Sequence, residues 1–332
     1  MLSFLQSSRQ AFSAYLEGGV TQDQIASILK MIGLPILGFL CFLLVWQFTA
    51  NNVVTSLGSF PSPAEVSSQF KNLIVEHKEQ RAQVVKKYER QKIRNEKKLA
   101  ANPDAKIKWR DYKSRITFFD QILTSLFTVM CGFIVASIIA IPIGIIIGLS
   151  ANVYSAINPI IQILKPVSPL AWLPLVTMVV SAVYVSDNPA VSKSFLVSMI
   201  TVSLCSLWPT MLNTAVGVTS VSKDWTNVSQ VLRLSWWTHV QKIVIPASIP
   251  MIFTGLRLSI GIAWMVLIAA EMLAQNPGLG KFVWDEFQNG SSNSLGRIMV
   301  AILVIGIIGF FLDRVILLIQ RLVSWDKTAV IR

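Results

Sequence analysis

The sequence predicts an all-α, polytopic membrane protein with six transmembrane helices. Of its 332 residues, 53% are hydrophobic and 14% are charged, whereas an ordinary soluble domain carries about 25% charged residues. A bilayer core about 30 Å thick requires roughly 20 apolar residues in a helix, because lipid offers no hydrogen-bond partner to an open backbone. Six stretches reach this length: 31–50, 118–150, 166–186, 194–216, 249–273 and 298–318.

The first predicted span, residues 31–50, follows a polar segment of residues 1–30. In that segment Thr21 and Gln24 have the spacing of a capping box, which predicts a helix leading into the span. The apolar run is longer than a signal-peptide centre of roughly 7 to 15 residues, and it lacks a small-residue cleavage site. We therefore expect it to remain in the mature protein as a membrane anchor.

Residues 118–330 are expected to form a core of the other five helices. In the second span, Gly144 and Gly148 form a GxxxG pair that lets another helix approach closely, and Pro142 predicts a kink. Proline recurs in the third and fourth spans, at Pro166, Pro169, Pro174 and Pro209. Irregular helices of this kind suit a bundle around a path better than a plain anchor.

The positive charges between the spans predict that both termini lie in the cytoplasm, because short cytoplasmic loops carry an excess of Lys and Arg. With the N-terminus inside, ten basic residues lie on that side: Arg9, Lys30, Lys165, Lys223, Arg233, Lys242, Arg314, Arg321, Lys327 and Arg332. Only Lys193, Lys281 and Arg297 would lie in short outside loops. The basic segment between the first two spans opposes this orientation, since its length only just exempts it from the rule.

That segment, residues 51–117, is interpreted as a basic external insertion, with fifteen Lys and Arg against seven Asp and Glu. From 71 to 115 the apolar residues are sparse and helically spaced, which predicts a solvated helix, a break near Asn102 and Pro103, and a second helix entering the membrane. The positive surface would concentrate anions or bind an acidic partner; the alternative is an exposed extension. Nucleic-acid binding is disfavoured, because no aromatic platform interleaves with the charges.

The loop between the fourth and fifth spans, residues 221–247, is too apolar for a simple connection. Four of its apolar residues recur at helical spacing: Trp225, Val228, Val231 and Leu232. Ser235 is placed to cap a second short helix, which would end before Pro246. The pattern therefore predicts two short helices at the membrane surface.

Here the sequence resembles the inner-membrane permease subunits of binding-protein-dependent ABC importers, in the branch that moves nitrate, sulfonates, taurine and bicarbonate. Their signature loop reads approximately E-A-A, three residues, Gly, and a run ending in Leu-Pro or Ile-Pro. Aligning that proline on Pro246 puts Asn227, Val228 and Ser229 at the E-A-A positions and Arg233 at the glycine. Three of these four positions differ in chemistry: Asn227, for example, cannot form a carboxylate's salt bridge, and Arg233 lacks glycine's freedom at positive φ.

Other segments look like the nitrate-type members of this branch: residues 132–150, 212–218, 252–261, 269–273 and 276–287. The resemblance covers roughly residues 119–330, matches weakly in the first span and is absent from the basic insertion. It implies the fold of a type I ABC importer permease (MetI-like). It also implies a multi-pass protein of the bacterial inner membrane that is not an enzyme and binds no cofactor, since ATP is bound and hydrolysed by a separate subunit.

The partners implied are two ABC ATPase subunits, a second permease copy or homologue, a periplasmic or lipid-anchored substrate-binding protein, membrane lipid and a small anion, with no nucleic acid. The loop would insert a helix into a groove on the ATPase and pass its motion to the spans. The residues assigned to this coupling loop are Asp224, Trp225, Asn227, Val228, Ser229, Arg233, Trp236, Trp237, His239 and Pro246. The alternatives are an interfacial helix with its tryptophans at the headgroup level and a structural role for His239.

The sequence gives no sign of nucleotide, metal or covalent chemistry. Residues 277–282 read PGLGKF, which fails the phosphate-loop pattern because Gln275 and Phe282 stand where Gly and Ser or Thr are required. We interpret this segment as an external turn. With two histidines in all, and three cysteines inside apolar runs, neither a multi-histidine metal site nor a disulfide framework is expected.

Few residues qualify for a translocation path, because ionisable groups inside a membrane are costly and rare. Ser194, Ser198 and Thr201 lie on one face of the fourth span, where hydroxyls could donate weak hydrogen bonds to an oxyanion or simply serve helix packing. Arg257 and Glu271 stand in the fifth span. For Arg257 a structural pair and contact with an anion both stay open, whereas a carboxylate such as Glu271 would repel an anion and is more easily explained as structural.

The cargo favoured by the resemblance is nitrate, with nitrite as a second cargo, and bicarbonate, cyanate or an alkanesulfonate such as taurine are alternatives within the branch. An ion-coupled carrier or channel is less well supported, because neither inverted repeats nor charges at mid-membrane depth are evident. An integral membrane enzyme would need clustered acids, bases or metal ligands, and none is visible.

Overall fold

The computed structural model describes residues 22–55, 58–102, 107, 109–112, 114–185, 191–291 and 293–323. Thr21, with its predicted capping box, and both chain termini lie outside this part. The described chain is helical except for two short strands, β1 (Val54–Thr55) and β2 (Gly58–Ser59), which pair antiparallel. The predicted all-α membrane class is confirmed, because five helical segments of the described chain are long and apolar enough to cross a membrane.

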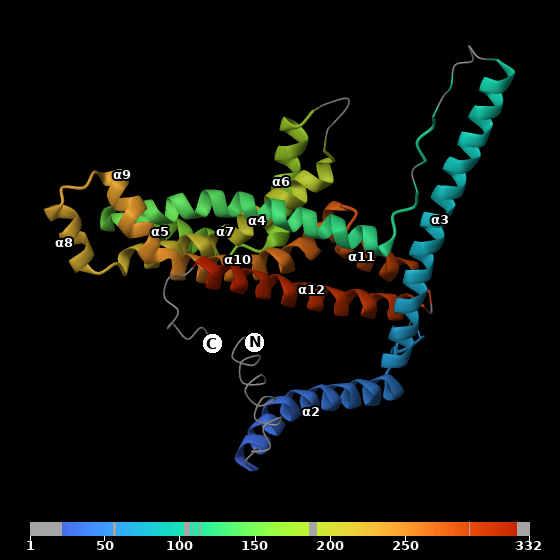
Figure 1. The fold of residues 1–332 in the computed structure, drawn as a ribbon, viewed down its shortest axis with the longest axis horizontal. Coiled ribbons are helices and arrows are strands. Elements are labelled where there is room, and N and C mark those ends of the chain that lie inside the picture. The colour runs from blue at the N-terminus through green and yellow to red at the C-terminus, as the bar shows by residue number, and fades with distance from the viewer. Residues whose placement is uncertain are drawn as a thin grey trace, which may run out of the picture.

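Four long helices lie side by side and form the body of the protein (Figure 1). They are α4 (Phe118–Leu149), α7 (Lys193–Thr219), α10 (Ile245–Ala274) and α12 (Ser294–Val323). The fifth apolar helix, α2 (Gln22–Asn52), lies apart from this bundle. Its apolar side chains are largely exposed, but Trp46 and Ala50 near its end are buried, and Nε1 of Trp46 donates to the carbonyl of Pro61 at 3.0 Å.

The third predicted span, residues 166–186, contains one helix, α6 (Pro169–Val183), which is shorter than the predicted span. The helix before it, α5 (Ala151–Leu164), was not predicted; it meets α6 at a bend of 98°, and the two together can count as a sixth span. Pro166 has no N–H to continue the hydrogen bonding of α5, which ends at Leu164 although Lys165 is still in the right-handed helical region. The Ser168 side chain then accepts from the Leu170 N–H to begin α6, with Pro169 in its first turn. Residue 186 lies outside the described chain.

The GxxxG prediction in the second span is confirmed by the packing of α4 on α7. A Cβ built on Gly144 would lie 2.6 Å from the Met211 carbonyl oxygen, and one built on Gly148 would lie 2.6 Å from Cβ of Val218. These two glycines therefore allow the helices to approach until backbone meets side chain.

Helix α10 packs closely against α7 where Pro209 interrupts the hydrogen bonding of α7. The Ser259 hydroxyl donates to the Ser206 carbonyl at 2.5 Å and accepts from the Thr210 N–H at 3.1 Å. A side chain from a neighbouring helix thus satisfies backbone groups that the proline leaves open, as apolar surroundings demand. All three residues are fully or almost fully buried.

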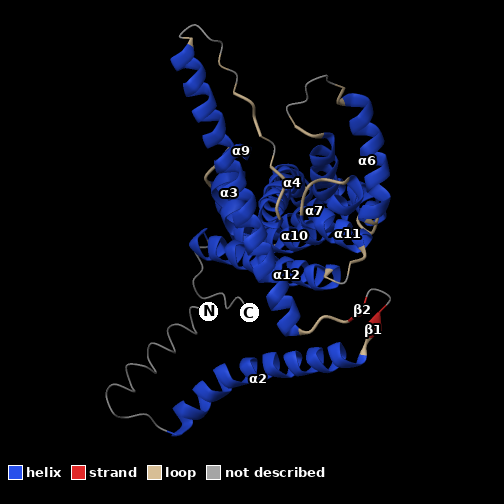
Figure 2. Ribbon diagram, turned by 90° about the vertical axis from the view of Figure 1, so that its right-hand side faces the viewer, coloured by secondary structure: helices blue, strands red, loops and turns tan. Residues whose placement is uncertain are grey.

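The basic insertion forms one long helix, α3 (Pro63–Ala101), which crosses the end of the bundle (Figures 1 and 2). A complete capping box between Ser62 and Glu65 begins it, and it ends before Asn102, at the predicted break. The described residues between this break and α4 are not helical, so the second helix predicted within the insertion is wrong. Its first turns join the core, since Val66 and Leu73 are buried there and ion pairs link Arg81 to Asp120 and Glu76 to Arg297. The base of the insertion is therefore part of the folded body.

Candidate functional site

The predicted coupling loop forms two short helices at the end of the bundle opposite α3 (Figure 1). They are α8 (Lys223–Val231) and α9 (Trp236–His239). The Ser222 side chain caps α8 by accepting from the Asp224 N–H at 3.2 Å, and Ser235 caps α9 by accepting from the Thr238 N–H at 3.3 Å, as predicted. We call residues 223–239 the elbow.

The turn between the two helices places Arg233 in the left-handed region, with φ 50°. This is the position that aligns with the signature glycine, so the bend of the family pattern is present without its glycine. For an L-residue with a side chain this conformation costs about 1–2 kcal/mol. The elbow therefore keeps its shape against a local backbone strain.

We expect Arg233→Gly to relax this turn and Arg233→Ala to leave the strain in place, because only glycine adopts positive φ without a steric cost. The gain with glycine should be about 1 kcal/mol, seen as slower amide exchange across residues 229–236. The alanine variant is the matched control, since it removes the same guanidinium but retains Cβ. Equal exchange in the two variants would mean that the charge of Arg233, not its backbone, governs the turn.

The second short helix, α9, ends at His239, before Pro246 as predicted, but no loop separates it from α10. A π-helical turn, η1 (Val240–Val244), joins α9 to α10, so residues Trp236–Ala274 form one uninterrupted helical run. At the junction the Ile245 N–H donates to the Val240 carbonyl, five residues back. A proline lacks the N–H and clashes with the carbonyl four residues earlier, and the wider π turn before Pro246 accommodates both defects.

The elbow carries a set of large apolar side chains that are exposed on the surface at this end of the bundle. Trp225 is 61% exposed, Trp236 55% and Trp237 67%, and the two adjacent indoles meet edge to face with centroids 5.0 Å apart. Other exposed apolar residues of the same two helices and their turn are Val228, Val231 and Leu232. An apolar cluster of this kind is typical of an interaction surface.

His239 fixes the two halves of the elbow to each other. Its Nδ1 lies 2.8 Å from the hydroxyl of Ser229, which is buried, while Asp224 and Asn227 remain exposed on α8. This hydrogen bond gives His239 a structural role, which was the alternative that the sequence offered.

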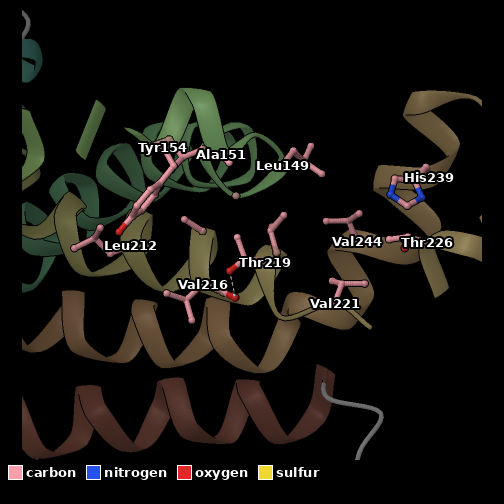
Figure 3. Close-up of a pocket in the computed structure, with 14 residues that line it drawn as sticks. Leu149, Ala151, Tyr154, Leu212, Val216, Thr219, Val221, Thr226, His239 and Val244 are labelled. Atoms are coloured by element: carbon pink, nitrogen blue, oxygen red, sulfur yellow. Dashed lines mark hydrogen bonds between the residues drawn. The ribbon is translucent and has the colours of Figure 1, made fainter. Parts of the chain in front are cut away.

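A cavity of about 580 Å³ separates the elbow from the core (Figure 3). It is lined by Leu149 of α4, Tyr154 of α5, Val216 and Thr219 of α7, Thr226 of α8 and His239 of α9, among others. Helix α8 is consequently not packed tightly against the ends of α4 and α5.

The hydroxyl stripe proposed for the translocation path is closed within the single chain. Ser198 and Thr201 are fully buried, and the Thr201 hydroxyl donates to the Val197 carbonyl of its own helix at 2.8 Å. Ser194 is half-buried, with Oγ 3.5 Å from Oδ1 of Asn276. The Ser198 hydroxyl has no hydrogen-bond partner in the described chain. These residues could meet a solute only if the surrounding helices moved apart, and their role in the path stays a prediction.

Arg257 is paired with Asp313 of α12, a residue for which the sequence predicts no role. Nε donates to Oδ1 at 2.5 Å and Nη2 donates to Oδ2 at 3.0 Å. Both side chains are about one third exposed in the single chain. A two-point guanidinium–carboxylate bond neutralises both charges and joins α10 to α12, which favours the structural interpretation of Arg257 over contact with an anion.

We expect Asp313→Ala to destabilise the protein more than the double variant Asp313→Ala plus Arg257→Met. The single variant leaves an unpaired arginine in a span, where insertion of that residue costs roughly 2.5 to 3.5 kcal/mol, whereas the double variant leaves no charge. Thermal unfolding of the purified protein in one detergent measures both. Equal losses in the two variants, together with abolished transport in Arg257→Met alone, would instead assign Arg257 to the solute.

Glu271 is fully buried at the end of α10 and fastens the chain that follows it. Its carboxylate accepts from the Ser125 hydroxyl at 2.8 Å and from the Gly280 N–H at 3.0 Å, and the same hydroxyl accepts from the Leu279 N–H at 2.8 Å. A Cβ on Gly278 would lie only 2.1 Å from the carboxylate oxygen Oε1. Glu271 thus has a structural role here.

The segment that Glu271 fastens is only partly the predicted turn. The chain turns at residues 275–278, with Gln275 at φ 55°, and then forms α11 (Leu279–Asn289). The prediction that all of PGLGKF is a turn is therefore wrong: its last four residues begin an amphipathic helix, whose first N–H groups bond to Ser125 and Glu271.

Comparison with known proteins supports the resemblance. Residues 140–325 match the family model described as binding-protein-dependent transport system inner membrane component. The chain is 38% identical over 204 residues to the nitrate import permease protein NrtB of Synechococcus elongatus. The aligned residues make up 61% of this chain and 69% of that protein. It is 36% identical over 204 residues to the bicarbonate transport system permease protein CmpB of the same organism, covering 61% and 68%.

One solved structure is also similar, an amino acid ABC transporter with histidines. The two chains superpose with a TM-score of 0.46 at 13% sequence identity, over 62% of this chain and 92% of that chain.

Proposed function

The chain belongs to the family of binding-protein-dependent transport system inner membrane components, and from this premise we propose that it carries nitrate into the cytoplasm. It is an ABC importer permease subunit of the nitrate and bicarbonate branch, a multi-pass inner membrane protein that works with an ATPase and a substrate-binding protein. Nitrate is supported by the similarity to nitrate permeases and by the basic insertion, which would raise the local concentration of anions at the entrance.

The observation that supports a coupling role is the exposed aromatic face of the elbow. A permease that does not hydrolyse ATP must receive motion from a separate ATPase, and an exposed cluster of tryptophans on short helices suits a groove on such a subunit. Trp236 lies at the start of the helical run that continues into α10, so displacement of the elbow passes directly into a span. The cavity beneath α8 leaves room for that displacement.

In this proposal both termini and the elbow face the cytoplasm, and α3 and α11 face outward. The positive charges flanking the spans support this orientation. Labelling of single cysteines introduced at Trp225 and at Lys78, in intact cells with an impermeant reagent, tests it. We expect Lys78→Cys to react and Trp225→Cys to react only after permeabilisation; the reverse pattern would overturn both the orientation and the coupling role.

Nitrate is tested by reconstituting the permease with its ATPase in liposomes. ATP hydrolysis is measured with the purified substrate-binding protein and nitrate, nitrite, bicarbonate or taurine in turn. We expect nitrate to stimulate hydrolysis above the level with binding protein alone. Stimulation by bicarbonate without stimulation by nitrate would replace the cargo, in line with the similarity to the bicarbonate permease CmpB, and would leave the coupling role intact.

A further inference from the structure

The function proposed above uses the distal part of the basic insertion only as positive charge and gives it no binding partner. We call residues 84–116 the arm. Of the arm, the structure describes the second half of α3 and residues 107, 109–112 and 114–116, which we call the returning segment. In the sequence this arm contains twelve Lys and Arg and four Asp and Glu, out of 29 and 17 in the whole chain. A net charge of +8 is thus concentrated in a tenth of the protein.

The direction of the arm places it along a membrane surface. Figures 1 and 2 show α3 running across the end of the bundle, whereas α4 and α12 run along the bundle axis. If those helices cross the bilayer, α3 lies outside the hydrocarbon, at the level where Phe118 and Ser294 begin their helices. The half of α3 beyond its base extends past the bundle, over the surface where lipid would lie.

One stripe of α3 faces the bundle near the base of the helix and the returning segment further along. Val66 and Leu73 on this stripe are buried in the core, and about five and six helical turns after Leu73, Gln91 and Asn95 lie on the same stripe. The Gln91 side chain donates to the Arg110 carbonyl at 3.0 Å and accepts from the Arg110 N–H at 3.2 Å. The returning segment therefore lies on the side of α3 that is nearer the bundle (Figure 1).

The returning segment exposes apolar and cationic side chains together. Ile107, Trp109 and Ile116 are 39%, 57% and 51% exposed, and Arg110 and Arg115 beside them are also exposed. Ile116 stands two residues before the start of α4. Tryptophan, isoleucine and arginine in this arrangement are typical of a segment that lies in the headgroup region.

A shallow, largely open groove on one face of α3 continues the cationic surface. It is lined by Arg90, Ile93, Arg94, Lys97 and Lys98, four cations around one exposed isoleucine. Within the described residues of the arm the only ion pair joins Lys92 to Glu96 at 4.0 Å, so the four cations of the groove have no acidic partner there. Guanidinium and ammonium groups so arranged suit the phosphate oxygens of lipid headgroups.

From these observations we propose that the arm lies on the outer surface of the bilayer and binds acidic phospholipids. A soluble acidic protein would instead approach from the side away from the membrane. Helical spacing puts Glu89 and Glu96 on that side, roughly opposite the stripe that faces the bundle. Glu89 and Glu96 thus lie away from the returning segment, which carries the exposed Trp109. The inference is independent of which solute the permease carries.

The test uses the purified importer complex in nanodiscs of phosphatidylcholine, with or without about a quarter of phosphatidylglycerol. Amide hydrogen exchange is followed in peptides from residues 84–116. We expect exchange to be about tenfold slower with the acidic lipid, and this protection to fall steeply at about 0.5 M salt, where the Debye length is a few ångströms.

Two matched double variants locate the effect. Arg94→Gln plus Lys98→Gln, in the groove, should remove most of the protection, whereas Lys71→Gln plus Lys78→Gln, on the outward side of the same helix near its base, should retain it. Glutamine preserves helix propensity, so unchanged exchange in residues 63–80 serves as the check that α3 is folded. Trp109→Ala should weaken protection in both lipids, because its contribution does not depend on charge.

Equal exchange in the two nanodisc compositions would overturn the proposal. So would protection that appears only when the purified substrate-binding protein is added, because the arm would then be a protein-binding surface. Loss of protection in the Lys71 and Lys78 variant equal to that in the groove variant would also overturn it, since a general effect of net charge would explain the result.

Discussion

Replacement of Trp236 and Trp237 by alanine is expected to uncouple the importer. The two indoles are more than half exposed on the elbow, and in the proposed complex both would be buried in the ATPase. Truncation of a buried aromatic at the centre of an interface commonly costs about 2 kcal/mol or more, and a combined loss near 3 kcal/mol lowers affinity by roughly a hundredfold. Co-purification of the ATPase and uptake in liposomes should fall together.

The chain offers a matched control in Phe310 and Phe311 of α12. These are also adjacent exposed aromatics with an edge-to-face contact, at a centroid distance of 5.9 Å, but they lie in an apolar span away from the elbow. Phe310→Ala plus Phe311→Ala should retain the ATPase. Normal association and uptake in the tryptophan variant would instead mean that the elbow tryptophans rest in the headgroup region, the alternative that the sequence left open.

The second large effect is expected at Glu271. Glu271→Ala removes the buried carboxylate that accepts from both the Gly280 N–H and the Ser125 hydroxyl, and it leaves both donors without this acceptor. Each unsatisfied group of this kind costs about 1–3 kcal/mol, so we expect a loss of roughly 3 kcal/mol in the free energy of unfolding and detachment of α11 from the bundle. Thermal unfolding in detergent and amide exchange in residues 276–289 measure the two effects.

Gly278 provides the check on this explanation. Gly278→Ala should destabilise the wild-type protein, because the new Cβ would overlap the Glu271 carboxylate. The same substitution should cost far less when Glu271 is already alanine, since the obstructing oxygens are gone. Additive losses in the double variant would contradict the proposed contact. Asp285→Ala, which removes an exposed carboxylate of α11 paired with Lys281, is the control and should change stability by less than about 1 kcal/mol.

The membrane class, most span positions and the capped elbow followed from the sequence because they depend on local chemistry. A run of apolar residues, a serine before a helix or two glycines four apart act within a few turns of the chain. The bend between α5 and α6 was missed for a related reason: the apolar run continues through Pro166, and hydrophobicity alone does not register the change in direction.

The contacts of the ionisable residues could not be predicted in the same way. Arg257 meets a residue 56 positions away, and Glu271 meets one 146 positions away. No periodicity links such partners, so the sequence could give only the expectation that a buried charge has a partner. Arg233 gave a misleading signal, because an arginine at the position of the signature glycine argues against a bend there. The rest of the fold nevertheless holds Arg233 at positive φ, and the bend forms.

The uninterrupted helix from Trp236 to Ala274 determines how this permease can be recombined with its relatives. A chimera that exchanges residues 221–247 alone would join foreign halves inside one helix, just beyond the π turn that Pro246 requires. Cuts at Ser220, after the end of α7, and at Gln275, where α10 ends in a left-handed residue, avoid this. The smallest transplantable unit is therefore a complete span together with its elbow.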